Sequence, residues 1–169
     1  MINIRQESSN DHKQVYNIHE QAFGQKEEPE IVERIRKGQF FVPELSLVAE
    51  MENQVVGHIL YSKIKINCTP EFECLALAPV AVLPAFQKQG IGKQLVRAGL
   101  KIAKDLDFEA VIVLGHKEYY PKFGFQKAAT WSILCPFEVP DEHFMAIELK
   151  AGVLEGKAGT VVYPAEFMG

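Results

Sequence analysis

The sequence predicts an α/β fold with helices packed on a central sheet, and three features of its middle third support this. Residues 77–82 are apolar at every position, as in a strand covered on both faces. A turn with Gly90 and Gly92 follows, and apolar residues then recur at helical spacing over residues 91–106. Residues 109–115 form a second apolar, largely β-branched run, which predicts the next strand.

The first third of the chain predicts one strand and two helices. Residues 2–6 alternate apolar and polar side chains, as a strand does. Polar residues 8–11 are of the types that cap the start of a helix, and Gly24 is expected to end that helix. Residues 26–30 open a second helix with acidic side chains at its positive end, and Gly38 closes it.

Two further strands are predicted before the central one. Residues 45–50 and 54–66 read as a hairpin with its turn at residues 52–53. Gly57 interrupts the second strand and indicates a bulge. The central strand is expected to begin at Glu73 and to stop before Pro84, because proline has no hydrogen-bond donor for the ladder.

The helix that follows is expected to bury one apolar face, made by Ile91, Leu95, Ile102 and Leu106. Beyond it, residues 135–141 contain two prolines and read as a loop, and residues 142–150 read as the last main strand. Residues 151–169 predict a loop and a short extra strand at residues 160–163. This extension is expected either to cap the sheet or to contact another subunit.

Composition limits the class of protein. The 169 residues suffice for one domain, or for one domain with an appendage, and 47% of them are hydrophobic. The net charge of −4 argues against a broad surface for nucleic acid or for an anionic membrane. The longest apolar stretch, residues 75–86, is too short to span a membrane and contains two prolines.

The cysteines and the first residues predict a cytoplasmic protein. Cys68, Cys74 and Cys135 have no Cys-x-x-Cys spacing, so neither a disulfide framework nor a metal site is expected. Residues 1–14 are polar and lack the apolar segment of a signal peptide.

The turn after the central strand has the features of an anion site. Gly90 and Gly92 let the backbone approach a ligand without a Cβ atom in the way. The helix start adds unpaired N–H groups and the positive end of the helix dipole. We interpret residues 87–93 as a cradle for a pyrophosphate group. The basic residues in and after it are Lys88, Lys93, Arg97, Lys101 and Lys104.

Two other glycine-loop families fit this turn less well. A P-loop needs glycine at Gln87 and serine or threonine at Gln94. The dinucleotide-binding fingerprint needs a glycine where Leu95 stands. For the loop taken alone, an ordinary strand, turn and helix with flexible glycines is the alternative.

Two motifs resemble the GNAT superfamily of acyl-CoA N-acyltransferases. The first is Gln-x-x-Gly-x-Gly, from Gln87 to Gly92, which is similar to the coenzyme A loop of that superfamily. The second lies about thirty residues later, where Tyr120 and the pair Gly124-Phe125 match Tyr-x-x-x-Gly-Phe. The resemblance covers most of the chain, from about residue 2 to about residue 150.

The resemblance implies a fold and a function. The fold is a mixed, mostly antiparallel sheet flanked by helices on both faces, with residues 1–150 as the acetyltransferase domain and residues 151–169 as an extension. The function is transfer of an acetyl group from acetyl-CoA to a primary amine of a small molecule or a protein, by direct attack in a ternary complex and without a metal. A homodimer is possible under this interpretation.

The resemblance also implies site residues. Backbone N–H groups of the central strand would bind the acyl carbonyl and the pantetheine arm, and Val82 is the expected partner of the carbonyl. Tyr120 is expected to protonate the departing thiolate as general acid, with Tyr119 as the alternative. The acceptor pocket is expected near Phe23 and residues 27–30. The predicted cofactor-binding residues are Val80, Ala81, Val82, Gln87, Lys88, Gln89, Gly90, Ile91, Gly92 and Lys93.

The chain departs from the superfamily pattern at two places. His116 stands in the region where many members have an asparagine that binds the pantetheine arm. Residues 76–79, where some members carry a glutamate base, have no side chain that could take a proton. The general base is therefore unassigned. A non-catalytic sensor that binds acyl-CoA, and a purely structural partner-binding domain, remain alternatives to the enzyme.

Overall fold

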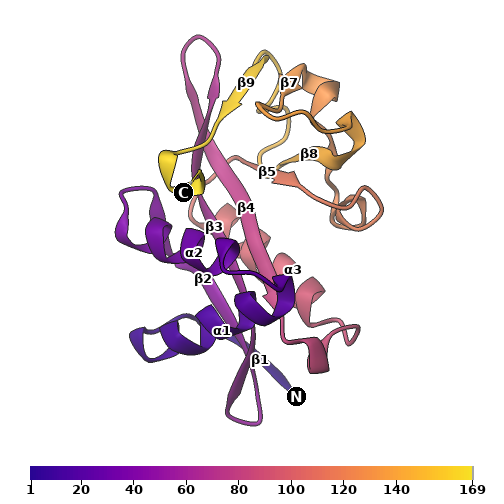
Figure 1. Ribbon diagram of the computed structural model, residues 1–169. Helices are drawn as coiled ribbons and strands as arrows, with labels where there is room; N and C mark the ends of the chain where they lie inside the picture. The colour runs from indigo at the N-terminus through magenta and orange to yellow at the C-terminus, as the bar shows by residue number, and fades with distance from the viewer. Residues whose placement is uncertain (169) are drawn as a thin grey trace.

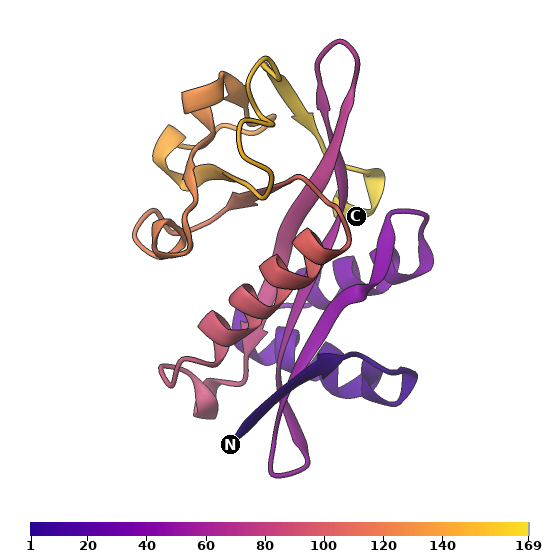
Figure 2. The same ribbon diagram turned by 180° about the vertical axis from the view of Figure 1, so that it is seen from behind.

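The computed structural model describes residues 1–168 and shows one mixed sheet with helices on both faces. Helices α1 (His12–Phe23) and α2 (Glu27–Lys37) lie on one face, and α3 (Ile91–Asp105) lies on the other (Figures 1 and 2). The strands are β1 (Ile2–Gln6), β2 (Phe41–Met51), β3 (Gln54–Asn67), β4 (Phe72–Val82), β5 (Ala110–Leu114), β6 (Gln126–Lys127), β7 (Ile133–Leu134), β8 (Phe144–Glu148) and β9 (Gly159–Val162).

The main path of the sheet runs β1-β2-β3-β4-β5-β8-β6. The pairs along this path are antiparallel except β4 with β5, which is parallel. The predicted fold class, a mostly antiparallel mixed sheet between helices, is therefore confirmed. None of the helices in residues 1–168 is both long and apolar enough to cross a membrane.

The hairpin of β2 and β3 has its turn where the sequence predicted it. Strand β2 begins at Phe41, earlier than the predicted start at residue 45. Glu52 and Asn53 both have positive φ, 50° and 64°, as a two-residue hairpin turn that matches the strand twist requires. The register shifts beside Gly57, where a bulge was expected. Gly57 also faces α3: a Cβ atom there would lie 3.2 Å from a methyl carbon of Leu95. Its missing side chain lets the helix approach the sheet.

The predicted buried face of α3 is partly wrong. Ile91 and Leu95 are buried as expected, but Leu106 is 38% exposed, and the buried stripe continues through Gly99 and Ala103 instead. Leu106 is exposed because α3 ends at Asp105 and residue 106 is its C-cap. On the buried face, the ring of Tyr61 of β3 occupies the space that a side chain on Gly99 would need. The Tyr61 hydroxyl donates a hydrogen bond to the carbonyl of Val96 at 2.8 Å, which fixes the helix against the sheet.

Strands β4 and β5 run together for a short distance only. They pair at Leu75 with Val111 and at Ala76 with Ile112, and β5 then turns away (Figure 1). On its other side β4 stays paired to β3, with a register shift at residues 78–79. The second half of β4 therefore has one backbone edge without a strand partner.

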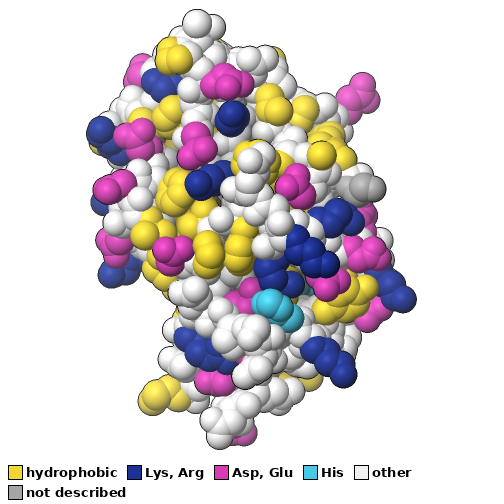
Figure 3. Space-filling view, turned by 90° about the vertical axis from the view of Figure 1, so that its left-hand side faces the viewer, with side chains coloured by type: hydrophobic (Ala, Val, Ile, Leu, Met, Phe, Trp, Pro, Cys, Tyr) yellow, Lys and Arg dark blue, Asp and Glu magenta, His cyan; other side chains and the backbone are white. Residues whose placement is uncertain are grey.

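The C-terminal segment caps the sheet, which is one of the two roles expected for it. β9 pairs antiparallel with β3 and parallel with β7. A single 3₁₀ turn, Ala165–Phe167, then lies against α2, where Arg34 Nε donates to the carbonyl of Glu166 at 2.9 Å. Figure 3 shows the side of the molecule that faces left in Figure 1. Acidic, basic and hydrophobic side chains are mixed there, so this side has no large patch of positive or of negative charge.

Candidate active site

The predicted cradle is a hollow of about 200 Å³ between the end of β4 and the start of α3. Gly90 has φ of 83°, a left-handed conformation that favours glycine, and its carbonyl accepts the N–H of Gln94 at 3.1 Å. The N–H groups of the first helical turn precede any intrahelical acceptor, so they can bind an anion. The hollow is lined by Val82, Phe86, Gln87, Lys88, Gly90, Ile91, Gly92, Lys93 and Tyr119.

Two contacts hold the shape of the cradle. The side-chain amide of Gln87 donates a hydrogen bond to the carbonyl of Val82 at 3.0 Å, so this side chain ties the loop to the end of β4. A Cβ atom on Gly92 would lie 3.2 Å from the Tyr119 hydroxyl, so the glycine keeps the hollow open on that side. Gln89 belongs to the same turn but does not line the hollow.

The pairing of β4 with β3 decides which of its amides are free. The N–H of Leu83 donates to the carbonyl of Val56 at 2.8 Å across this pair. Bonded and non-bonded residues alternate along an antiparallel pair, so Ala81 also turns its amide toward β3. The amides of Val80 and Val82 therefore point to the open edge beside β5. Among the three predicted strand residues, these two have N–H groups available to a ligand.

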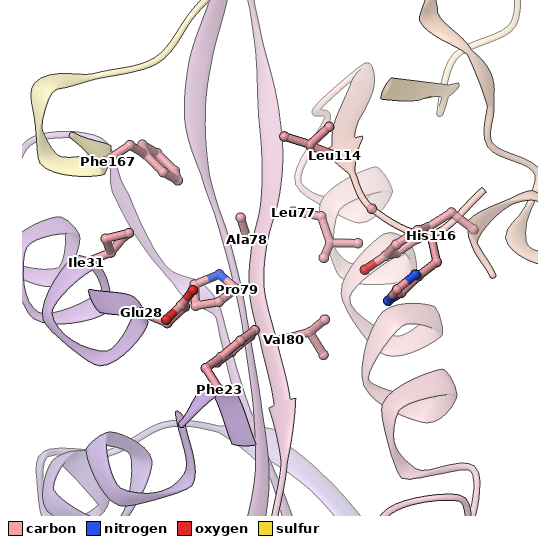
Figure 4. A pocket seen from close by; sticks show the side chains of 12 residues that line it. Phe23, Glu28, Ile31, Leu77, Ala78, Pro79, Val80, Leu114, His116 and Phe167 are labelled. Atoms are coloured by element: carbon pink, nitrogen blue, oxygen red, sulfur yellow. The ribbon is translucent and has the colours of Figure 1, made fainter. Parts of the chain in front are cut away.

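A larger cavity of about 410 Å³ lies where β4 and β5 have separated. Figure 4 shows Phe23, Glu28 and Ile31 approaching it from α1 and α2, and His116 from the segment after β5. We call it the main cavity. Its lining residues are Phe23, Glu28, Ile31, Leu77, Ala78, Pro79, Val80, Leu114, Gly115, His116, Tyr120 and Phe167.

Tyr120 stands in the main cavity as a protonated phenol. Its side chain is 7% exposed, and burial raises the pKa of its hydroxyl to about 12. The ring packs edge-on against Tyr119 and Phe125, at centroid distances of 5.0 and 5.6 Å. Within the described residues the hydroxyl makes no hydrogen bond to a protein group, so its proton is available to a ligand. Tyr119 lines the cradle instead, so the two tyrosines serve different cavities.

The structure brings together most of the predicted residues and adds some that the sequence did not indicate. Val80 and Tyr120 meet in the main cavity, and Val82 with most of residues 87–93 forms the cradle. Of the predicted acidic cluster, Glu28 lines the main cavity and its neighbours do not. Leu114 and Phe167 were not predicted, because no motif marks them and Phe167 meets α2 only through the tertiary fold. Residues 1–168 hold no group of three side chains suited to a metal ion.

Comparisons with known proteins agree with this geometry. The model of the acetyltransferase (GNAT) family matches residues 12–125. The uncharacterized N-acetyltransferase YjhQ of Escherichia coli K12 is 33% identical over 135 residues, 79% of this chain and 75% of that protein. The uncharacterized N-acetyltransferase YhbS of the same strain is 30% identical over 147 residues, 86% of each chain.

Solved structures give the same result. The crystal structure of Escherichia coli YhbS in complex with CoA is similar with a TM-score of 0.92 and 28% identity, covering 99% of this chain and 92% of that one. A GNAT family acetyltransferase from Brucella melitensis in complex with acetyl-CoA has a TM-score of 0.82 and 31% identity, covering 99% and 98%. The resemblance drawn from the sequence motifs is thereby confirmed, and the chain belongs to the acetyltransferase (GNAT) family.

Proposed function

We propose that this protein transfers an acetyl group from acetyl-CoA to a primary amine that enters the main cavity. The observation that carries this is the arrangement along β4: the anion cradle lies at its end, the free amides of Val80 and Val82 follow, and Tyr120 stands beside them. This order matches that of a thioester cofactor, whose diphosphate, pantetheine arm and reacting carbonyl follow one another. The complexes of the two structural relatives with CoA and acetyl-CoA support the same assignment.

The proposed reaction takes place in one ternary complex. The neutral amine attacks the thioester carbonyl carbon, a C–N bond forms, and the carbonyl oxygen takes negative charge. We assign stabilisation of this charge to the N–H of Val80, because Val80 lines the main cavity with Tyr120, whereas Val82, the residue expected from the sequence, lines the cradle. The intermediate collapses with cleavage of the C–S bond. Tyr120 gives its proton to the thiolate, and the amine nitrogen loses one proton. The products are the N-acetyl amine and CoA with a free thiol.

Two side chains of the main cavity can accept the proton of the amine. Glu28 approaches from α2 and His116 from the segment after β5 (Figure 4). A carboxylate also attracts the ammonium form in which an alkyl amine arrives, because such amines have a pKa of about 10.4. This ammonium loses one proton before the neutral amine attacks, and the proton lost later by the amide nitrogen restores the Tyr120 phenol. We assign Glu28 to binding of the ammonium group. His116 is the remaining group that could take the proton.

The decisive experiment measures thiol release from acetyl-CoA with a panel of primary amines. We expect release that depends on the amine, with Tyr120→Phe lowering kcat by about 100-fold or more and changing the Kd for CoA little. The matched control is Tyr16→Phe on the surface of α1, which should leave kcat unchanged. Binding of CoA without amine-dependent release would favour the sensor, and no binding of CoA would favour the structural domain.

A further inference from the structure

A second cavity of about 190 Å³ opens beside the main cavity. We call it the apolar chamber. It shares four lining residues with the main cavity, so the two are contiguous: Leu77, Ala78, Leu114 and Phe167. The residues that line the chamber alone are Ala76, Ile112, Phe137 and Tyr163. All eight side chains are aliphatic or aromatic, and none carries a charge.

We propose that the apolar chamber receives an apolar group of the acceptor, so that the enzyme acts on primary amines that carry an aromatic or branched aliphatic substituent. This rests on the proposed function and extends it to the class of substrate. The amine nitrogen would lie in the main cavity near Glu28, with its substituent in the chamber.

The order of the cavities along β4 supports this assignment. Val82 lines the cradle, Val80 and Pro79 line the main cavity, and Ala76 lines the chamber. A cofactor whose diphosphate occupies the cradle therefore presents its thioester before it reaches the chamber. The chamber lies beyond the reacting carbonyl. Either the acyl chain of the thioester or the substituent of the amine would extend into this space.

The walls of the chamber place it on the acceptor side. Phe167 lines both cavities and stands in the 3₁₀ turn that packs on α2, the helix that supplies Glu28. Rings on this side form a continuous wall: Phe137 stacks on Tyr163 at a centroid distance of 5.6 Å, and Tyr163 meets Phe167 at 5.3 Å. The segment that supplies Phe167 thus lies beside both the chamber and the helix of Glu28, the proposed partner of the ammonium group.

This wall lies outside the part of the chain that the family model matches, although the two solved relatives cover 99% of the chain. The family model matches residues 12–125, whereas all three aromatic residues of the wall follow residue 125. Pairing of β9 with β3 holds the segment in place. A segment that is anchored in the sheet and yet lies outside the common core suits a specificity element rather than shared catalytic machinery.

The volume suits a ring or a short branched chain. An apolar protein cavity of about 150 Å³ admits benzene, so a chamber of about 190 Å³ has room for a phenyl or a 3-methylbutyl group. Each methylene that leaves water is expected to improve kcat/KM by about fourfold until the chamber is filled.

The test compares amines that share the reacting group and differ in the tail. We would measure kcat/KM by thiol release from acetyl-CoA for ethylamine, 3-methylbutylamine, phenethylamine and 1,4-diaminobutane. We expect phenethylamine and 3-methylbutylamine to exceed ethylamine by at least tenfold, and 1,4-diaminobutane to fall below both because its second ammonium group would enter an uncharged chamber.

Variants connect the preference to the chamber. Phe137→Ala and Tyr163→Ala change residues that line the chamber and not the main cavity, and Phe137 is 43% exposed, so its loss should be tolerated. Both should lower kcat/KM for phenethylamine by about tenfold while the value for ethylamine stays unchanged. Leu134→Ala is the matched control, because Leu134 is an exposed apolar residue that lines neither cavity.

Three results would overturn the inference. If all amines react equally well, the chamber does not bind the tail, although the proposed function stands. If butyryl-CoA or hexanoyl-CoA replaces acetyl-CoA with higher kcat/KM for ethylamine, the chamber binds the acyl chain instead. If CoA binds and no amine is acetylated, both the inference and the proposed function are wrong.

Discussion

Gly115 lies so close to Tyr120 that a Cβ atom on the glycine would overlap the tyrosine ring. Gly115 cannot easily move away, because its N–H donates to the carbonyl of His143 at 2.9 Å and its carbonyl oxygen lies 3.0 Å from His143 Nδ1. The position of the proposed general acid therefore depends on the missing side chain at residue 115.

The first prediction follows from this contact. Gly115→Ala should push the Tyr120 ring out of place and lower kcat by about 100-fold, since a shift of 1 Å in a reacting group has an effect of this size. Steady-state kinetics with a saturating amine would measure it. In the Tyr120→Phe background the same change should cost little more, because the acid is already absent. Independent, fully additive losses would show that Gly115 acts through something other than Tyr120.

The second prediction concerns the alkaline limb of the pH profile. As the proposed general acid, Tyr120 would donate a proton, so its contribution to kcat would be lost only as the pH rises through its pKa, which burial raises to about 12. An ordinary tyrosine would lose its proton near pH 10. We therefore expect kcat to stay level between pH 8 and about pH 10. A decline in kcat centred near pH 10 would count against Tyr120 as the acid.

The third prediction tests the cradle. Gly92→Val places a branched side chain where the Cβ atom already comes within 3.2 Å of the Tyr119 hydroxyl, and it fills the space for the diphosphate. We expect the Kd for CoA to rise at least about tenfold, which corresponds to about 1.4 kcal/mol. A thermal shift titration with CoA would detect this as a smaller rise of the melting temperature.

The matched control for the cradle is Gln94→Val. This residue is exposed on the same helix and does not line the hollow, so the substitution places the same β-branched side chain in the first part of α3 without obstructing the ligand. CoA affinity close to that of the unaltered protein is expected. Equal losses in both variants would mean that the helix, and not the space at Gly92, determines binding.

A buried hydrogen-bonded chain crosses from α1 to the first strands. Ser46 Oγ donates its one proton to Glu7 at 2.7 Å, so it accepts from His58 Nε2 at 2.8 Å. His58 Nδ1 then has a free lone pair and accepts the Nε2 proton of His19 at 2.8 Å. Both imidazoles are fully buried, and these directions require His58 to be neutral.

The fourth prediction is loss of stability in mild acid. Burial lowers the pKa of His58 from 6.5 to about 3 in the folded state. The unfolded chain therefore binds more protons between these two values, and the free energy of unfolding falls as the pH decreases below 6.5, by about 1.4 kcal/mol per pH unit for this group. Burial lowers the pKa of His19 in the same direction.

Urea unfolding at pH 7, 6 and 5 would measure this dependence. His58→Gln removes the titrating group, so we expect a flatter dependence on pH even if the variant is less stable at pH 7. His116→Gln is the control, because His116 is exposed and is not among the groups that shift the pKa of His58. An unchanged slope in the His58 variant would show that other groups cause the acid sensitivity.

Local patterns were sufficient to predict the elements and the motif residues. Apolar runs, turn residues and helical spacing predicted β3, β4 and the start and end of α1 closely, because each depends on residues near one another in sequence. Gly90 could be recognised because its left-handed conformation is a local requirement. The spacing between the glycine loop and Tyr120 was enough to indicate the family.

Contacts between distant segments were not predictable in this way. Periodicity did not show that the buried face of α3 passes through Gly99, because the Tyr61 ring that fills this space comes from a distant strand. Leu106 was misjudged because α3 already ends at Asp105. The apolar chamber has the same origin, since Phe137 and Phe167 come together only when β9 joins the sheet.

The sequence by itself determined the order of strands and helices, the anion loop and the tyrosine opposite β4, because local sterics and hydrogen bonding specify these. Only the tertiary structure decided which β4 amides remain free and which side chains line the main cavity. Both depend on strand register and on packing between segments more than a hundred residues apart, and no short stretch of sequence encodes either.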